Sequence, residues 1–129
     1  MRGKRAIAAA ISGTVLLVAA GPPEASADSR VVDSYCSSTG DYCQQVVKQA
    51  SGTIKIRWAS FSYPGKYKLC VKGAGTDSCR RFKSKLEGEL YQDSVVWQKK
   101  FPDGGPGRYK VKWFYRGGQV GKTLEFRSN

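Results

Sequence analysis

The stretch RYKVKW, residues 108–113, alternates residue by residue between basic and apolar side chains. Successive side chains of a β-strand point to opposite sides of the sheet, so Tyr109, Val111 and Trp113 would share one face and the three basic residues the other. A repeat of two residues therefore predicts a half-buried strand with a basic outer surface.

The same alternation appears in Thr53–Ala59 and in Lys66–Lys72, and Trp58 is expected to be a buried core tryptophan. Shorter strand candidates are Val31–Cys36, Tyr42–Lys48, Cys79–Lys83, Leu90–Lys99 and Val120–Arg127. Only Ser78–Leu90 leaves room for a helical turn. About seven or eight short strands separated by Gly, Pro and Ser turns predict an all-β, antiparallel sandwich.

Residues 1–27 have the organisation of a secretory signal peptide. Basic residues at positions 2, 4 and 5 precede the apolar run Ala6–Ala20, and small residues at 25–27 are suited to cleavage after Ala27. Ser12, Gly13 and Thr14 interrupt that run, which is too short for a membrane span. We therefore expect a secreted, extracellular protein with no transmembrane segment and a single β-sandwich domain over residues 28–129.

Four cysteines in an exported chain are expected to form two disulfides. The local pairs, Cys36 with Cys43 and Cys70 with Cys79, each bracket a turn rich in Gly, Ser, Thr and Asp and would staple two hairpins. Zinc ligation and a redox-active pair are the alternatives, but zinc sites usually contain histidine and redox pairs have Cys-x-x-Cys spacing.

The segment DGGPGRYKV, residues 103–111, resembles the entry to the penultimate strand of immunoglobulin-like domains, where a Tyr hydroxyl ties the corner to nearby backbone. Tyr109 would be that residue, and Val111 occupies the position of the second inter-sheet cysteine of antibody domains. The resemblance implies an Ig-like sandwich without the antibody disulfide.

Over its whole length the chain resembles small secreted actinobacterial proteins that contain disulfides and have no assigned activity. The matching segments are Tyr35-Cys36, Gly40–Cys43, Gly65–Val71, Ser94–Trp97, Phe101-Pro102, Gly107–Trp113 and Gly121–Phe126. This resemblance implies export, disulfides and an Ig-like sandwich, and it brings no activity with it.

Catalytic chemistry is not expected. The chain contains no histidine, which excludes Ser-His-Asp and Cys-His machinery, and its only methionine is Met1, which leaves copper without its usual ligands. The carboxylates are scattered, and the closest pair for acid–base work is Glu87 and Glu89. We expect no enzyme activity, no metal and no cofactor.

The positive charge is distributed in a pattern. The chain carries 22 Lys and Arg against 10 Asp and Glu, and many of the basic residues fall on the polar sides of predicted strands. The candidate anion-binding residues are Lys55, Arg57, Lys66, Lys68, Lys72, Arg108, Lys110 and Lys112. If their strands share a sheet, they form a basic surface that Phe61, Tyr63 and Phe114 could edge.

Three functional classes follow. The first is a non-catalytic binding module for an anionic polymer of the cell envelope or surroundings, such as a cell-wall polymer or an acidic polysaccharide. The second is a protein-interaction module, for example an inhibitor of a secreted enzyme or a toxin-like effector, that uses the loop Ser37–Asp41 or Gly73–Asp77. A small enzyme is the third. Outward lysines that only keep the protein soluble and block aggregation are the alternative to a binding surface.

Overall fold

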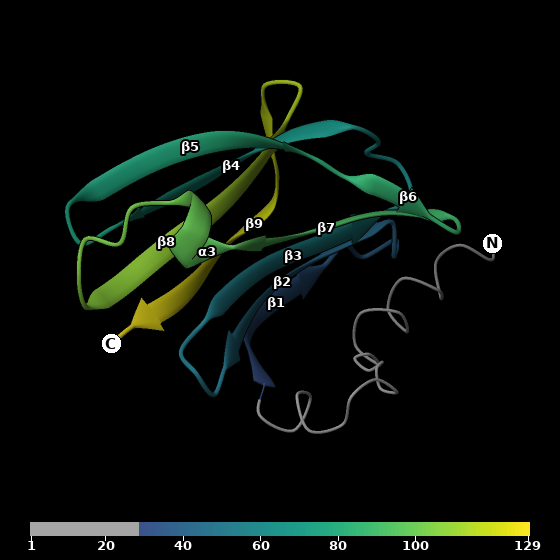
Figure 1. Ribbon diagram of the computed structural model, residues 1–129. Coiled ribbons are helices and arrows are strands. Elements are labelled where there is room, and N and C mark those ends of the chain that lie inside the picture. The colour runs from purple at the N-terminus through teal and green to yellow at the C-terminus, as the bar shows by residue number, and fades with distance from the viewer. Residues whose placement is uncertain (1–28) are drawn as a thin grey trace.

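The computed structural model describes residues 29–129, and the predicted signal peptide lies outside the described residues. Nine strands form two antiparallel sheets that face each other (Figure 1). The first sheet has the order β1 (Ser29–Cys36), β2 (Tyr42–Gln49), β3 (Ile54–Ser60), β7 (Leu90–Val96) and β6 (Lys85–Glu87). The second has the order β5 (Thr76–Lys83), β4 (Lys66–Gly73), β8 (Gly107–Tyr115) and β9 (Gly118–Ser128).

The core lies between the two sheets and contains the apolar side of each alternating segment. Tyr109, Val111 and Trp113 of β8 are at most 1% exposed, and Trp58 of β3 is 2% exposed. The period of two residues thus predicted correctly which side of these strands is buried. Burial of this apolar set from both sheets is the main stabilising contribution to a sandwich of this kind.

Two sequence predictions of local structure are wrong. Ser78–Leu90 contains the end of β5, all of β6 and the start of β7 in place of a helical turn, which brings the strand count to nine. The helical turn is α3 (Trp97–Lys100), which begins inside the segment predicted as a strand, Leu90–Lys99. The Gln98 side chain ties this turn to the start of β3, because its amide accepts a hydrogen bond from Ile54 N (3.0 Å) and donates one to Gly52 O (2.9 Å).

Both predicted disulfides are present. Cys36 is bonded to Cys43 across β1 and β2, and Cys70 to Cys79 across β4 and β5. Each bond joins directly opposite residues of its strand pair, so each disulfide also fixes the register of its hairpin.

The corner before β8 is organised by Tyr109. Its hydroxyl donates to Gly105 O (2.7 Å), accepts from Gly104 N (3.0 Å) and lies 3.2 Å from Asp103 Oδ1. Burial, and then the Asp103 carboxylate, raise the pKa of this hydroxyl. The predicted corner contact is therefore confirmed, and it holds residues 103–107 where Gly104 packs directly against the backbone of Ala74 in the β4–β5 turn.

Candidate anion-binding face

Six of the eight predicted basic residues lie together on the outer side of the second sheet. Strands β4 and β8 are neighbours in this sheet, with Lys72 opposite Lys110 and Cys70 opposite Lys112. The buried side chains Leu69 and Val111 point inward, so the residues that alternate with them point outward. We call this surface the basic face; the six residues on it are Lys66, Lys68, Lys72, Arg108, Lys110 and Lys112.

Lys55 and Arg57 do not belong to this surface. Their strand, β3, pairs with β2 and β7 in the other sheet, so the prediction that they share a sheet with Lys68 is wrong. The error has a physical origin, because alternation reveals which side of a strand is polar but carries no information about its neighbours.

Three further basic residues on the sheet escaped the sequence prediction. Arg81 is opposite Lys68, Lys83 is opposite Lys66, and Arg127 of β9 is opposite Arg108. The register needed to find the first two was available in the sequence. Once Cys79 is bonded to Cys70, alternation along β5 places Arg81 and Lys83 on the same side as Cys79.

Like charges are paired directly across the strands of the basic face. The pairs are Lys72 with Lys110, Lys68 with Arg81, Lys66 with Lys83 and Arg108 with Arg127. Such pairs destabilise a sheet by a few tenths to about 1 kcal/mol each. Compensation is partial: Lys72 also lies opposite Asp77 and Lys110 opposite Glu125, and between residues that the structure describes the one ion pair is an exposed contact of 3.7 Å from Arg108 to Glu125.

Two hollows lie along this surface. The first, of about 530 Å³, has the Cys70–Cys79 disulfide and Phe114 among its lining and is bordered by Lys72, Asp77, Arg108, Lys110 and Lys112. The second, of about 560 Å³, is lined by Lys66, Lys68, Arg81 and Arg116 with Pro64, Phe114 and Tyr115. Phe114 lines both, so the two hollows meet at its ring.

Phe114 is the one aromatic of the three predicted that lies on the basic face. The Lys68 ammonium stands 5.0 Å from the centre of its ring in a cation–π contact. Tyr63 instead stacks on Trp58 with ring centres 5.6 Å apart, and Phe61 packs against Cys43, Ala59 and Leu90. Both are used in packing because each follows β3 in the loop that joins the two sheets.

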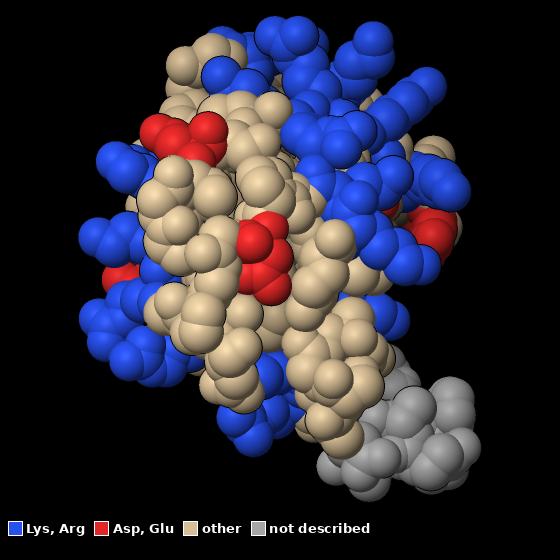
Figure 2. Space-filling view, turned by 60° about the vertical axis from the view of Figure 1, so that its left-hand side comes forward, with Lys and Arg blue, Asp and Glu red and all other residues tan. Residues whose placement is uncertain are grey.

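Positive charge is not confined to this face. Lys and Arg side chains cover much of the surface in Figure 2, most densely at its upper right, whereas Asp and Glu form small separate patches. The basic face differs from a generally positive surface in having cations directly opposite one another on adjacent strands, beside two hollows.

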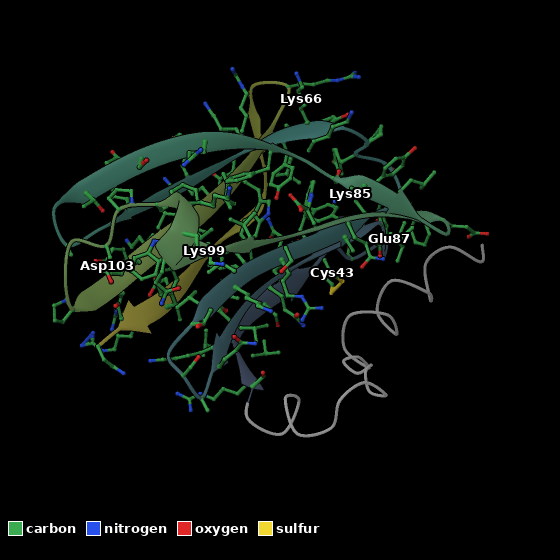
Figure 3. The ribbon with its side chains drawn as sticks, viewed as in Figure 1. Cys43, Lys66, Lys85, Glu87, Lys99 and Asp103 are labelled. Atoms are coloured by element: carbon green, nitrogen blue, oxygen red, sulfur yellow. A yellow bond between two sulfur atoms is a disulfide. The ribbon has the colours of Figure 1, made fainter. Side chains whose placement is uncertain are left out.

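A third hollow, of about 300 Å³, holds the nearest approach to a mixed acid–base cluster. It is lined by Arg57, Lys85, Glu87 and Asp93 among others, and Figure 3 places Lys85 and Glu87 around β6. Asp93 is occupied by a 2.8 Å hydrogen bond that it accepts from Tyr67 Oη. Burial, and then the Asp93 charge, raise the pKa of Tyr67. Among residues 29–129, no group of three His, Cys, Asp or Glu side chains is placed to hold a metal ion.

The two predicted interaction loops differ in their surroundings. In Ser37–Asp41 the Ser37 hydroxyl accepts from Asp41 N (2.9 Å), which orders the loop internally beside its disulfide. The loop Gly73–Asp77 packs against Gly104, and its end residues Gly73 and Asp77 line the first hollow. This loop therefore adjoins the basic face.

Comparisons with known proteins return nothing for this chain: no family model matches, and neither a curated protein nor a solved structure does. No helix in the described part of the chain is long and apolar enough to cross a membrane. We therefore infer the function from the geometry and charge of the basic face.

Proposed function

We propose that this protein is an exported, non-catalytic binding module whose basic face holds an anionic polymer of the cell envelope or the extracellular surroundings. The observation that carries the proposal is the set of like-charged pairs across β4, β5, β8 and β9. Each pair reduces the stability of the sheet, and bound anions would relieve all of them at once.

Solubility and protection of sheet edges do not account for the central part of this charge. Edge lysines block pairing with other chains, but β4 lies between β5 and β8, and β8 lies between β4 and β9. Lys72 and Lys110 are therefore on interior strands, opposite each other and each opposite one carboxylate, Asp77 or Glu125, whereas lysines spaced apart would keep the protein soluble without mutual repulsion.

The spacing of the charges favours an extended polymer over a small ligand. Cations repeat about every 7 Å along a strand and stand about 5 Å apart between strands, which is the spacing of the sheet itself. From Lys66 to Lys72 the surface runs for about 20 Å. A chain with one anionic group per short repeating unit would contact several of these cations together.

We infer that the sandwich is Ig-like. In chain order, strands β2 to β9 correspond to A, B, C, C′, D, E, F and G of that fold, and their neighbours support the correspondence: A-B-E-D in one sheet and C′-C-F-G in the other. The Tyr109 corner at the start of β8, the strand in position F, also supports it. In this assignment β1 is an additional edge strand.

The experiment that tests the function compares two triple variants of equal charge. The first variant replaces Lys72, Lys110 and Lys112 by Gln. The second replaces Lys55 of the other sheet and Lys99 and Lys100 of α3, none of which lines either hollow. Affinity for heparin and for long-chain polyphosphate is measured by fluorescence titration across a range of salt concentrations.

The first triple should weaken binding by about ten- to a hundredfold at low salt and flatten its salt dependence, since three local contacts of about 0.5–1 kcal/mol are lost. The second should change affinity by about threefold at most. Equal losses in both triples would contradict the proposal. Tighter binding of single-stranded DNA than of either polymer would reassign the face to nucleic acid, where stacking on aromatics supplies the affinity.

A further inference from the structure

The tip of the β8–β9 hairpin carries an arginine in an unfavourable backbone conformation. Tyr115 pairs with Gly118, so Arg116 and Gly117 form a two-residue turn with φ of +51° and +88°. The first position of such a turn favours Asn, Asp or Gly, and a long side chain is strained there. Backbone strain of this kind occurs preferentially at functional sites.

The exposed Arg116 side chain contacts the aromatic ring of Tyr115. Its guanidinium carbon lies 5.3 Å from the centre of the Tyr115 ring. Tyr115 is itself fixed, because its hydroxyl donates to Pro64 O (2.9 Å) and its ring packs edge-on against Tyr63 with centres 4.9 Å apart. The Arg116 guanidinium therefore lies over an aromatic platform, the Tyr115 ring, whose position is fixed by its own contacts.

This platform forms one wall of the second hollow of the basic face. The lining contributes four cations, Lys66, Lys68, Arg81 and Arg116, and includes no carboxylate. Apolar surface comes from Phe114, Tyr115 and Pro64. The first hollow differs, because its lining includes the Asp77 carboxylate and the Cys70–Cys79 disulfide.

We propose that this hollow, here called the Arg116 hollow, binds a sugar residue that carries a tetrahedral oxyanion group, either sulfate or phosphate, and that Arg116 determines specificity for it. The inference rests on the proposed function. The planar guanidinium would bind two oxygens of the anion, and the sugar ring would lie against Phe114 and Tyr115. A bare polyphosphate offers no ring, so it would use the array of charges alone.

The test uses Arg116→Asn, which places a favoured residue in the turn, and Arg127→Asn, the same change on β9 of the basic face. Binding is measured by calorimetry for a heparin tetrasaccharide, which carries sulfates, a phosphomannan fragment, which carries phosphates, and polyphosphate. Thermal unfolding of each variant is measured in parallel.

Arg116→Asn should weaken binding of at least one of the two glycans by about tenfold or more, and the affected glycan identifies the anion. Arg127→Asn should weaken glycan binding by about twofold, and both variants should reduce polyphosphate binding by the same small factor. The unfolding midpoint of Arg116→Asn should equal or exceed that of the parent, because relief of the backbone strain offsets the lost ring contact.

Equal glycan losses in the two variants, or a lowered midpoint in Arg116→Asn, would overturn the role of Arg116 and leave the polymer-binding proposal standing. If the parent protein bound neither glycan nor polyphosphate, the proposed function itself would fail. Arg116→Lys keeps the positive charge but removes the planar guanidinium. Compared with Arg116→Asn, it should restore the polyphosphate affinity of the parent but less than half of the lost glycan binding energy. Full recovery of glycan binding would contradict the specificity assigned to the guanidinium.

Discussion

Replacing Lys83 by Glu should stabilise the protein. Lys83 lies directly opposite Lys66 across β5 and β4, and both side chains are exposed. Two unit charges about 6 Å apart in water repel by about 0.7 kcal/mol before screening. Lys83→Glu converts this repulsion into an attraction of similar size, so the free energy of unfolding should rise by about 1 kcal/mol at low salt. A domain of this size would then unfold at a midpoint about 4 °C or more higher.

The assay is thermal unfolding followed by circular dichroism at about 0.01 M and about 1 M salt, where the Debye lengths are about 30 and 3 Å. Most of the gain should vanish at the higher concentration. Lys55→Glu is the matched control, because Lys55 faces Val47 and Val96 in the other sheet and experiences only the general field. A gain in stability for Lys83→Glu no larger than that for Lys55→Glu, or one that survives in high salt, would contradict the repulsion assigned to Lys66 and Lys83.

Three further predictions concern the fold. Tyr109→Phe removes the corner hydroxyl and should lower the free energy of unfolding by about 1–2 kcal/mol in a urea titration; an unchanged midpoint would mean that these hydrogen bonds contribute nothing. Burial raises the pKa of the Tyr67 hydroxyl above about 10, its value in the unfolded chain. The neutral hydroxyl therefore contributes fully to the free energy of unfolding below about pH 10, and this contribution is lost as the pH rises above that value. Tyr67→Phe should therefore make the alkaline fall in stability shallower, and an identical fall would count against Tyr67. Gly121→Ala should lower the free energy of unfolding in the same urea titration by about 2 kcal/mol or more, because φ is +74° and the new methyl group would overlap the buried Gln44 amide. Wild-type stability of this variant would show that the Gln44 side chain can move aside at little cost.

Much of the fold follows from local rules that the sequence displays. Alternation decides which side of β3, β4 and β8 is buried, since it reports directly on the pleat. Closely spaced cysteines around a turn are well placed to bond across a hairpin, as both pairs do, and the Gly-x-Tyr entry to β8 forms the expected corner.

Which strands share a sheet, and which loops meet, depends on contacts between segments far apart in the chain, and local sequence patterns carry no information about these contacts. Lys55 and Lys68 have the same sequence context, a lysine between apolar neighbours, yet β3 and β4 fall in different sheets. The loop after β3 crosses from one sheet to the other, and nothing in its composition reveals that crossing. The Arg116 hollow likewise requires a hairpin tip, the Pro64 loop and β5 to meet, which only the assembled sandwich specifies.

The most direct test of the central claim is a nuclear magnetic resonance titration of the oxidised protein with a heparin oligosaccharide, followed through backbone amide shifts. The account predicts perturbations concentrated in β4, β5 and β8 and at the Arg116 turn, decreasing as salt is added, with β1, β2 and β3 unaffected. Perturbations concentrated in Ser37–Asp41, or spread evenly over both sheets, would contradict the claim that the basic face is the binding site.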